Sequence, residues 1–259
     1  MIMELSDLHG IDISSWQRGL SPSSLNSVDF AILKLSEGTS WNDPSFDEFY
    51  SAATIPLGAY VYSHATTEGE AQAEAIHALS LLHGRKLPLG VYMDVEEQKQ
   101  LALSDSHLTA VVKAFCDAIK RGGYRAGAYG SAGNLWAKVG PSYLGDDVIV
   151  WVAQWGSRPR MGDVWQFSAS DHVDGFNGNV DGSKVLSERF GQMVVSQEPI
   201  NNGSSTQPIE PPKENVCEVA LTLPIVKFGD RGLHVKLMQT ALIAKGYNCG
   251  WMGADGDFG

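Results

Sequence analysis

Residues 89–98 read LGVYMDVEEQ, the most informative stretch of the chain. Its apolar first half is typical of a strand buried on both faces of a parallel sheet. Because side chains two residues apart on a strand point to the same face, Asp94 and Glu96 should project together while Val95 turns into the packing. Their Cβ atoms would then lie roughly 6–7 Å apart. The stretch predicts a buried strand that delivers two carboxylates at its C-terminal end, where barrel enzymes place their active sites. A charged strand exit without catalytic function is the alternative.

Similar apolar segments recur along the chain and alternate with helical ones. One predicted helix starts at Thr67, where Glu70 can complete a capping box, and another ends at Gly122–Gly123. This alternation predicts an α/β fold with a largely parallel sheet, and the number of units predicts a barrel. Helices look short or missing after Gly156, so an irregular barrel is expected. The predicted strands are Gly10–Ser14, Phe30–Leu35, Leu57–His64, Leu89–Glu96, Arg125–Tyr129, Val148–Gln154 and Val164–Ser168.

The composition changes abruptly near residue 196. Residues 196–215 read SQEPINNGSSTQPIEPPKEN, a stretch of prolines and polar residues that is typical of a linker. We therefore expect a large domain over residues 1–195, the linker, and a short module over residues 216–259.

Charge and cysteine content narrow the function classes. The formal net charge of −11 argues against nucleic acid as a partner, because phosphate binding depends on Lys and Arg. No apolar run approaches the roughly 18–20 residues of a membrane span, so no membrane partner is expected. The three cysteines are too few for a disulfide framework or a zinc site. Cys116 should be a buried thiol on a helix, and the sequence leaves open whether Cys217 and Cys249 pair.

Further carboxylates lie within or after other predicted strands. Asp12 lies in the first strand, Glu37 follows the second, and Asp181 lies in the sequence GNVDGS. A barrel would bring these strand ends to one rim, together with Asp94 and Glu96. Each alone is more simply explained as a turn or cap residue. As a set they suggest glycoside cleavage, which needs one acid to protonate the leaving oxygen and one group to stabilise the cationic sugar.

Aromatic and amide side chains occur at the same strand ends. Sugar rings have flat apolar faces and polar edges, and aromatic side chains with a polar group suit them. The candidate sugar contacts are therefore Tyr60, Tyr62, Tyr129, Trp155 and Gln166. Core or rim packing is the alternative for each.

Other chemistries fit the sequence poorly. It has no G-x-G-x-x-G, Walker, H-E-x-x-H or G-x-S-x-G motif. His64 could line the cleft or be structural. No metal and no cofactor are expected, although the acidic cluster could bind a cation adventitiously.

Taken in order, several motifs resemble glycoside hydrolase family 25, the Chalaropsis-type or Cellosyl-type muramidases, over residues 9–190. They are GIDISSWQ, LKLSEGTSWNDPSF, LGAYVYSHATT, GVYMDVEE, VIVWVAQW, DVWQFS and NVDGS. The resemblance implies an irregular, flattened TIM-like β/α barrel. It also implies hydrolysis of the β-1,4 bond between N-acetylmuramic acid and N-acetylglucosamine, with retention of configuration.

The resemblance assigns a role to each candidate residue. Glu96 would be the general acid and base, and Asp94 would stabilise positive charge or orient the substrate's acetamido group. Asp12 and Asp181 would complete the acidic cluster, while Tyr60, Tyr62, Tyr129, Trp155 and Gln166, with Glu37, would contact the sugar. The nucleophile is either a carboxylate or the acetamido group. We favour the acetamido group, because two carboxylates on one strand face are poorly placed to attack opposite sides of a sugar.

The C-terminal residues resemble the first half of a small helical peptidoglycan-binding module. An amphipathic helix would carry Val235, Met238 and Leu242 on its apolar face, followed by Lys245–Tyr247 and the loop Asp255–Gly259. About 40 residues bury little core, so a partial module is expected.

The expected function is that of a lysozyme of the phage endolysin or autolysin type, with peptidoglycan glycan strands as its partner. A glycan-binding protein without activity and a hydrolase of another aminosugar polymer are the alternatives. The N-terminus lacks the pattern of a secretory signal. We therefore expect cytoplasmic accumulation before release by lysis, or another route to the cell wall.

Overall fold

The computed structural model divides the chain into two units, Met1–Ser204 and Ser205–Gly259. Apart from Ser196, the predicted linker lies outside the residues that the structure describes, as does most of the predicted module, including Cys217 and Cys249. The described residues are 5–196, 227, 229–232, 235–236, 238–240 and 256–258.

The first unit is an eight-stranded barrel. Around the barrel the strands follow the order β1, β9, β8, β7, β6, β5, β4, β2, and β2 pairs again with β1 to close the sheet. The short strand β3 (Trp41–Asn42) extends β2 outside the ring. The eight barrel strands are β1 (His9–Ile13), β2 (Phe30–Glu37), β4 (Leu57–Tyr62), β5 (Val91–Asp94), β6 (Ala126–Ser131), β7 (Ile149–Ala153), β8 (Val164–Asp171) and β9 (Val180–Val185).

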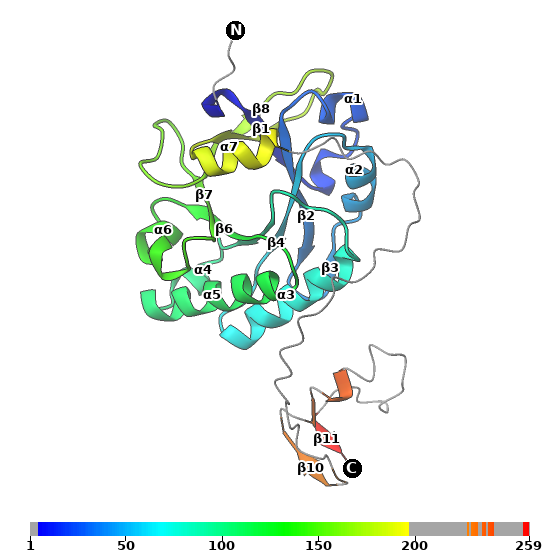
Figure 1. Cartoon of the computed structure of the whole chain (residues 1–259), viewed down its shortest axis with the longest axis vertical. Coiled ribbons are helices and arrows are strands. Elements are labelled where there is room, and N and C mark those ends of the chain that lie inside the picture. Colours follow the sequence, from blue (N-terminus) through cyan, green and yellow to red (C-terminus); the bar gives the residue numbers. More distant parts are fainter. Residues whose placement is uncertain are drawn as a thin grey trace. The chain divides into compact units, whose positions relative to one another are not determined.

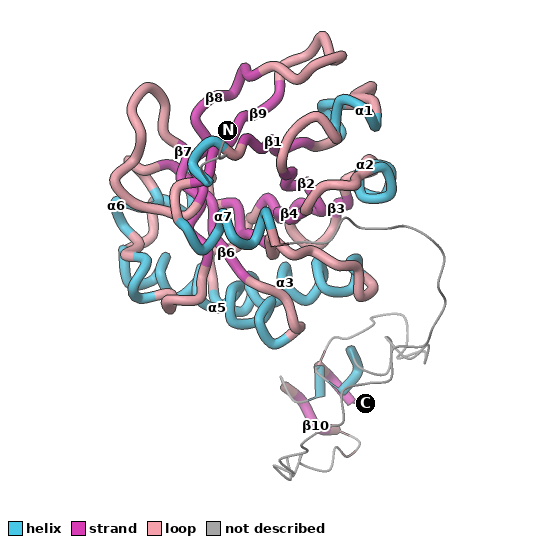
Figure 2. The backbone as a smooth tube through the Cα atoms, turned by 45° about the horizontal axis from the view of Figure 1, so that its top comes forward, coloured by secondary structure: helices cyan, strands magenta, loops and turns pink. Residues whose placement is uncertain are grey.

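All the pairings among the first seven barrel strands are parallel, as the sequence predicts. Only β9 runs the other way, and Figure 2 shows it between β8 and β1. We did not predict β9, because its sequence VDGSKV has no apolar run. The strand predicted over Leu89–Glu96 is also shorter than expected. It ends at Asp94, since Glu97 already begins the next helix as its N-cap.

Long helices cover the barrel on the side of β2, β5 and β6, whereas no helix connects β7 to β8 or β8 to β9. α3 and α5 pack against each other and cover β2, β5 and β6 (Figure 1). No helix lies between Ala153 and Val164 or between Asp171 and Val180, which confirms the irregularity expected after Gly156. The helices of this unit are η1 (Leu5–Asp7), η2 (Ser15–Gln17), α1 (Pro22–Leu25), α2 (Phe46–Ala52), α3 (Glu68–Leu82), α4 (Gln98–Leu101), α5 (Asp105–Arg121), α6 (Leu135–Lys138), η3 (Pro141–Tyr143) and α7 (Glu188–Val195).

The two long helices begin and end where their sequences indicate. The Thr67 hydroxyl and the Glu70 carboxylate form the predicted capping box of α3. The Ser104 hydroxyl accepts from the backbone N–H of His107 at the start of α5, and Gly122 ends that helix. Such caps satisfy the backbone groups that a helix end leaves without partners.

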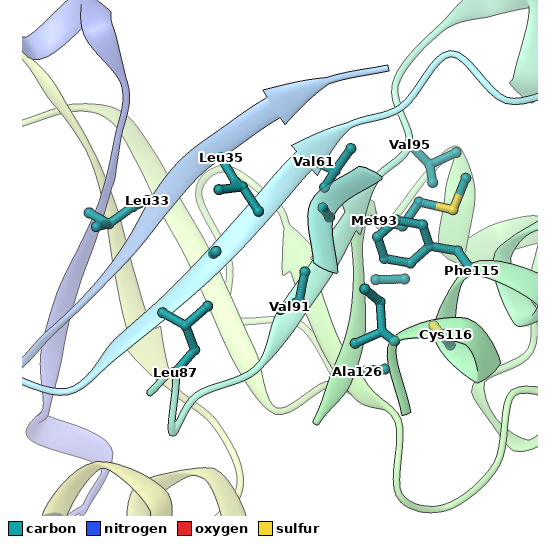
Figure 3. Close-up of a cluster of buried hydrophobic side chains, with 14 of the residues drawn as sticks. Leu33, Leu35, Val61, Leu87, Val91, Met93, Val95, Phe115, Cys116 and Ala126 are labelled. Carbon is teal, nitrogen blue, oxygen red and sulfur yellow. The ribbon is translucent and has the colours of Figure 1, made fainter. Parts of the chain in front are cut away.

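The outer layer of the core lies between the sheet and its helices. Figure 3 shows Val91, Met93 and Val95 packed against Phe115 and Cys116 of α5. The Cys116 thiol is fully buried, as predicted, and its sulfur lies 3.7 Å from the carbonyl oxygen of Gly127. Burial raises the pKa of this thiol to about 12.

The inner layer fills the barrel with the side chains of the opposite strand faces. Phe30, Tyr92 and Trp151 are fully buried there. The ring of Phe190, from α7, meets that of Phe30 edge-on at 5.5 Å and closes the N-terminal end of the barrel. Glycines make room for these large rings. A Cβ on Gly127, for example, would lie 2.4 Å from the Tyr92 ring.

In the second unit, the described residues form two short paired strands and a helical segment that is hydrogen-bonded to them. β10 (Asp230–Arg231) pairs antiparallel with β11 (Asp257–Phe258). The side chain of Gln239 donates to the carbonyl of Asp257 at 2.9 Å and accepts from the N–H of Gly256 at 2.8 Å. The described residues between 235 and 240 are helical. The peptidoglycan-binding module itself stays a prediction.

The substitution Gly127→Ala should destabilise the barrel. The new methyl group would meet the Tyr92 ring at 2.4 Å and the Ile149 carbonyl oxygen at 2.8 Å, inside a filled interior. Overpacking of this kind typically costs about 1–3 kcal/mol. We expect a loss of that size in the free energy of unfolding, measured by urea denaturation with circular dichroism. Gly133→Ala is the control, because its Cβ would meet nothing within 4 Å. Equal stability of the two variants would contradict this packing.

Candidate active site

A cleft of about 150 Å3 opens at the C-terminal ends of the parallel barrel strands, and we call it the acidic cleft. Alternation along the strands explains its lining. On β2, Phe30 and Ile32 face the interior and are followed on the same face by Lys34. On β5, Tyr92 is followed in the same way by Asp94. The lining residues are Asp12, Ser14, Trp16, Lys34, Tyr60, Tyr62, Asp94, Glu96, Tyr129, Trp151, Gln166 and Asp181.

The antiparallel strand β9 brings two of the acids together. Asp12 and Asp181 are directly opposite each other in the pairing of β1 with β9. The amide nitrogen of Gln166 donates to Oδ2 of Asp12 at 2.9 Å, and the Tyr129 hydroxyl donates to Oε1 of Gln166 at 2.7 Å. A hydrogen-bonded chain therefore runs from β6 through β8 to β1 across the floor of the cleft.

The other two acids come from β5 and the residues after it. Asp94 is 5% exposed, and its Oδ1 atom is buried without a hydrogen-bond partner. Val95 packs into the outer core, as predicted. Glu96 lies two residues beyond the end of β5, where its side chain is exposed to solvent. One carboxylate is therefore fixed in the wall of the cleft while the other reaches its mouth.

Desolvation by the surrounding cleft raises the pKa of all four carboxyl groups, including Glu96, whose side chain still reaches solvent. Charge repulsion adds to the effect for three of them. Asp181 repels the charge of Asp12 and of Glu96, and Glu96 and Asp12 repel that of Asp94. The pKa values of Asp12 and Asp94 are raised well above the usual value of a carboxyl group. The hydrogen bond from Gln166 opposes part of the shift for Asp12. The cluster can thus hold protons at a pH where isolated carboxyl groups have lost them.

Aromatic rings form the base and part of the edge of the cleft. Trp151 lies at the base, with the ring centroid of Tyr129 at 4.5 Å and that of Tyr60 at 6.4 Å. Burial raises the pKa of both tyrosines, so their hydroxyl groups stay protonated. Trp16, by contrast, is 88% exposed, although it borders the cleft. An exposed indole next to buried polar groups provides a flat apolar surface for a ligand ring.

The structure brings most of the predicted site residues into this cleft. Glu37 and Trp155 are the exceptions, because neither lines it. Glu37 forms ion pairs with Lys34 and His64, and Trp155 is 56% exposed after the end of β7. The predicted residues that line the cleft are Asp12, Tyr60, Tyr62, Asp94, Glu96, Tyr129, Gln166 and Asp181.

Four lining residues were not singled out from the sequence. Ser14, Trp16 and Trp151 all lie within motifs quoted above, and Lys34 interrupts the apolar strand FAILKLSE. The spacing of Lys34 from Phe30 and Ile32 was the available signal. A charged residue at the inward positions of a strand points to a polar end of the barrel.

A family model for the glycosyl hydrolases of family 25 matches residues 11–176, well over half of the chain. The chain belongs to glycoside hydrolase family 25. It is therefore a glycoside hydrolase, and the fold and family expected from the sequence motifs are confirmed.

Individual relatives agree with the family model. Lysozyme M1 of Streptomyces globisporus is 30% identical over 203 residues, which is 70% of this chain and 68% of the relative. The N,O-diacetylmuramidase of Chalaropsis sp. is 31% identical over 124 residues, 42% of this chain and 59% of the relative. The crystal structure of the bacterial lysozyme from Streptomyces coelicolor aligns with a TM-score of 0.62 and 26% identity, covering 74% of this chain and 98% of that one.

Within the described residues, no group of three or more His, Cys, Asp and Glu side chains is arranged to hold a metal ion. No helix in the described part of this family 25 hydrolase is long and apolar enough to cross a membrane.

Replacing Asp94 with Asn should stabilise the enzyme at neutral pH. The pKa of Asp94 is raised in the folded state, so between the usual carboxyl pKa and the raised one the folded state binds more protons than the unfolded state. Its contribution to stability therefore falls as pH rises through that window. The neutral amide avoids this penalty. We expect a higher Tm for the variant at pH 7, by about 2–4 °C for each kcal/mol relieved.

Thermal unfolding from about pH 3 to pH 7 tests this expectation, and the difference should disappear below about pH 4. Asp174→Asn is the matched control, because Asp174 is exposed. An Asp94→Asn variant no more stable than wild type at pH 7 would show that ionised Asp94 does not destabilise the folded state.

Proposed function

We propose that this family 25 glycoside hydrolase is a lysozyme that cleaves the β-1,4 bond between N-acetylmuramic acid and N-acetylglucosamine in bacterial peptidoglycan. The observation that carries the proposal is the pair Asp94 and Glu96 in a cleft with two further acids and a floor of aromatic rings. The names of the family's relatives, a lysozyme and a diacetylmuramidase, support the choice of substrate. The site of action is the bacterial cell wall, reached on lysis of the producing cell or by export.

Glu96 is the general acid and base of the proposed mechanism. Its side chain reaches solvent at the mouth of the cleft, so it can approach the glycosidic oxygen of a bound chain. Burial and the charge of Asp181 raise its pKa, which favours a proton donor. After protonating the leaving sugar, the same carboxylate can accept a proton from the incoming water.

Asp94 orients the substrate's acetamido group. Asp94 lines the cleft, so its carboxylate can accept the acetamido N–H of a bound sugar. The acetamido oxygen would then attack the anomeric carbon, and hydrolysis of that intermediate gives retention of configuration. This route also suits the positions of the two carboxylates, Asp94 at the end of β5 and Glu96 two residues beyond it. Neither of them must attack the sugar from its opposite face.

Asp12 and Asp181 complete the negative field around the reacting sugar. Gln166 and Tyr129 fix Asp12 through the hydrogen-bonded chain across the cleft floor. Tyr60, Tyr62 and the exposed Trp16 supply surfaces on which sugar rings can lie. Developing positive charge at the anomeric carbon is stabilised by such preorganised carboxylates.

The variant Glu96→Gln should lose turnover and keep glycan binding. A general acid contributes about 10²–10⁴-fold to the rate, so a loss of at least 10²-fold is expected. Purified peptidoglycan is digested and reduced with borohydride, and the products are identified by mass spectrometry. Wild type should create reduced N-acetylmuramic acid ends, and Glu48→Gln, an exposed residue of α2, serves as the control.

Three outcomes would contradict parts of this proposal. An unchanged rate for Glu96→Gln would refute the assignment of the acid. Reduced N-acetylglucosamine ends would indicate a glucosaminidase. Wall binding without any released sugar would indicate a glycan-binding protein.

The acetamido route predicts that N-deacetylated glycan is a poor substrate. Without the acetyl group there is no internal nucleophile, although Glu96 can still protonate the leaving oxygen. We expect kcat to fall far more than binding when chemically deacetylated chains replace acetylated ones of equal length. Equal kcat values would instead favour a carboxylate nucleophile.

A further inference from the structure

Lys34 is the one cation among the residues that line the acidic cleft. Its side chain is only 12% exposed, which is unusual for a lysine without a structural reason. The ammonium nitrogen lies 2.9 Å from Oε2 of Glu37 and 5.1 Å from the ring centroids of both Trp41 and Tyr62. One ion pair and two cation–π contacts therefore hold it against the wall of the cleft.

Glu37 is itself held by a row of polar and charged side chains along the barrel rim. Its Oε1 atom lies 3.3 Å from Nε2 of His64, and Nδ1 of His64 lies 2.5 Å from Oε1 of Glu97. The ammonium of Lys99 is 2.9 Å from the other oxygen of Glu97. We call this alternating row, Lys34, Glu37, His64, Glu97 and Lys99, the rim chain.

Buried hydrogen bonds fix the middle of the rim chain. Glu74 of α3 is 3% exposed, and its carboxylate accepts from the Ser63 hydroxyl at 2.6 Å and from the backbone N–H of His64 at 2.8 Å. The side chain of Gln100 donates to the Ser63 hydroxyl and to the Ala65 carbonyl, both at 3.1 Å. The rim chain is thus anchored in the core and is more than a set of surface ion pairs.

The inner end of the rim chain meets two residues of the cleft. Tyr62 is the register partner of Glu37 on one side and of Asp94 on the other, so the three lie in a row across β2, β4 and β5. Lys34 contacts Tyr62 through its ring. Its positive charge also lowers the pKa of Asp94, against burial and the charges of Glu96, Asp12 and Asp181.

We propose that Lys34 is a positioning residue for hydrolysis: held by Glu37 and the rim chain, its ammonium keeps Tyr62 in place for the sugar and sets a positive charge in the cleft that Asp94 lines. This inference rests on the proposed function, because it assumes that Asp94 must be ionised to accept the acetamido N–H. It gives Glu37 the role of anchoring the lysine in place of direct contact with the sugar.

Loss of the charge should shift the pH dependence of the enzyme. Without Lys34 the pKa of Asp94 rises, so Asp94 becomes protonated at a higher pH and the acid limb of the kcat/KM profile moves upward. An unpaired opposite charge beside a carboxyl group typically changes its pKa by about 1–3 units. Because Glu37 neutralises part of the Lys34 charge, we expect an upward shift of at most about one pH unit. The charged and titratable groups that face Asp94 and Lys34 in the cleft and along the rim are Asp12, Glu37, Tyr60, Tyr62, His64, Glu96, Glu97, Tyr129 and Asp181.

The test compares Lys34→Met, Lys34→Gln and Lys34→Arg with wild type on soluble peptidoglycan fragments, from about pH 3 to pH 8. Both neutral variants should show the upward shift and a higher KM, because Tyr62 loses its contact. Arginine keeps the charge and the ring contacts, so its acid limb should stay at the wild-type position. Lys113→Met is the control, since Lys113 pairs with Asp117 on the surface of α5.

The outcomes separate this inference from the proposed function. If wild type produces muramic acid ends and the neutral variants keep its pH profile, the inference is overturned and the function stands. An equal shift for Lys34→Arg also overturns it, because the charge would then not be the cause. If wild type produces no such ends, the proposed function fails first. If Lys34→Met does not fold, the Gln and Arg variants decide.

Discussion

Closure of the barrel is the constraint on which the rest of this structure depends. Once β1 pairs with both β2 and β9, every second side chain of each strand has only the interior to occupy. At the closed end that interior is filled by Phe30, Tyr92 and Phe190. At the other end the same alternation leaves polar side chains facing one another around a small opening. The packing that stabilises the domain and the arrangement of its acids are consequences of one geometry.

Most of the fold could be predicted, because the parallel strands are continuous apolar runs and the long helices have clear caps. β9 could not, since an antiparallel strand with polar residues carries no such signal, although its Asp181 was singled out as one of the recurring carboxylates. The site was predictable where a residue lies within a strand, as for Asp12 and Asp94. It was less so beyond strand ends, where loops set side-chain direction. Trp155, beyond the end of β7, lies outside the cleft lining for this reason. Glu37 is instead the last residue of β2 and follows an irregularity in the pairing of β2 with β4 between Lys34 and Ser36.

The acidic cleft illustrates how a binding site can oppose the stability of its own domain. Four carboxyl groups with raised pKa values lie in a partly buried space, and only one lysine offsets them. A hydrolase needs this arrangement because the sugar becomes cationic during cleavage, and the field must be present beforehand. The filled inner core and the caps of α3 and α5 compensate for the cost elsewhere in the barrel.

Cys116 has a consequence for where the domain can exist in folded form. It is the single cysteine among residues 1–196, so no disulfide can form within that part of the chain. Its buried thiol, with a pKa of about 12, is almost never in the thiolate form that oxidants attack. The barrel can therefore keep the same covalent structure in a reducing cytoplasm and in an oxidising exterior. Folding of this domain therefore needs no step of disulfide formation.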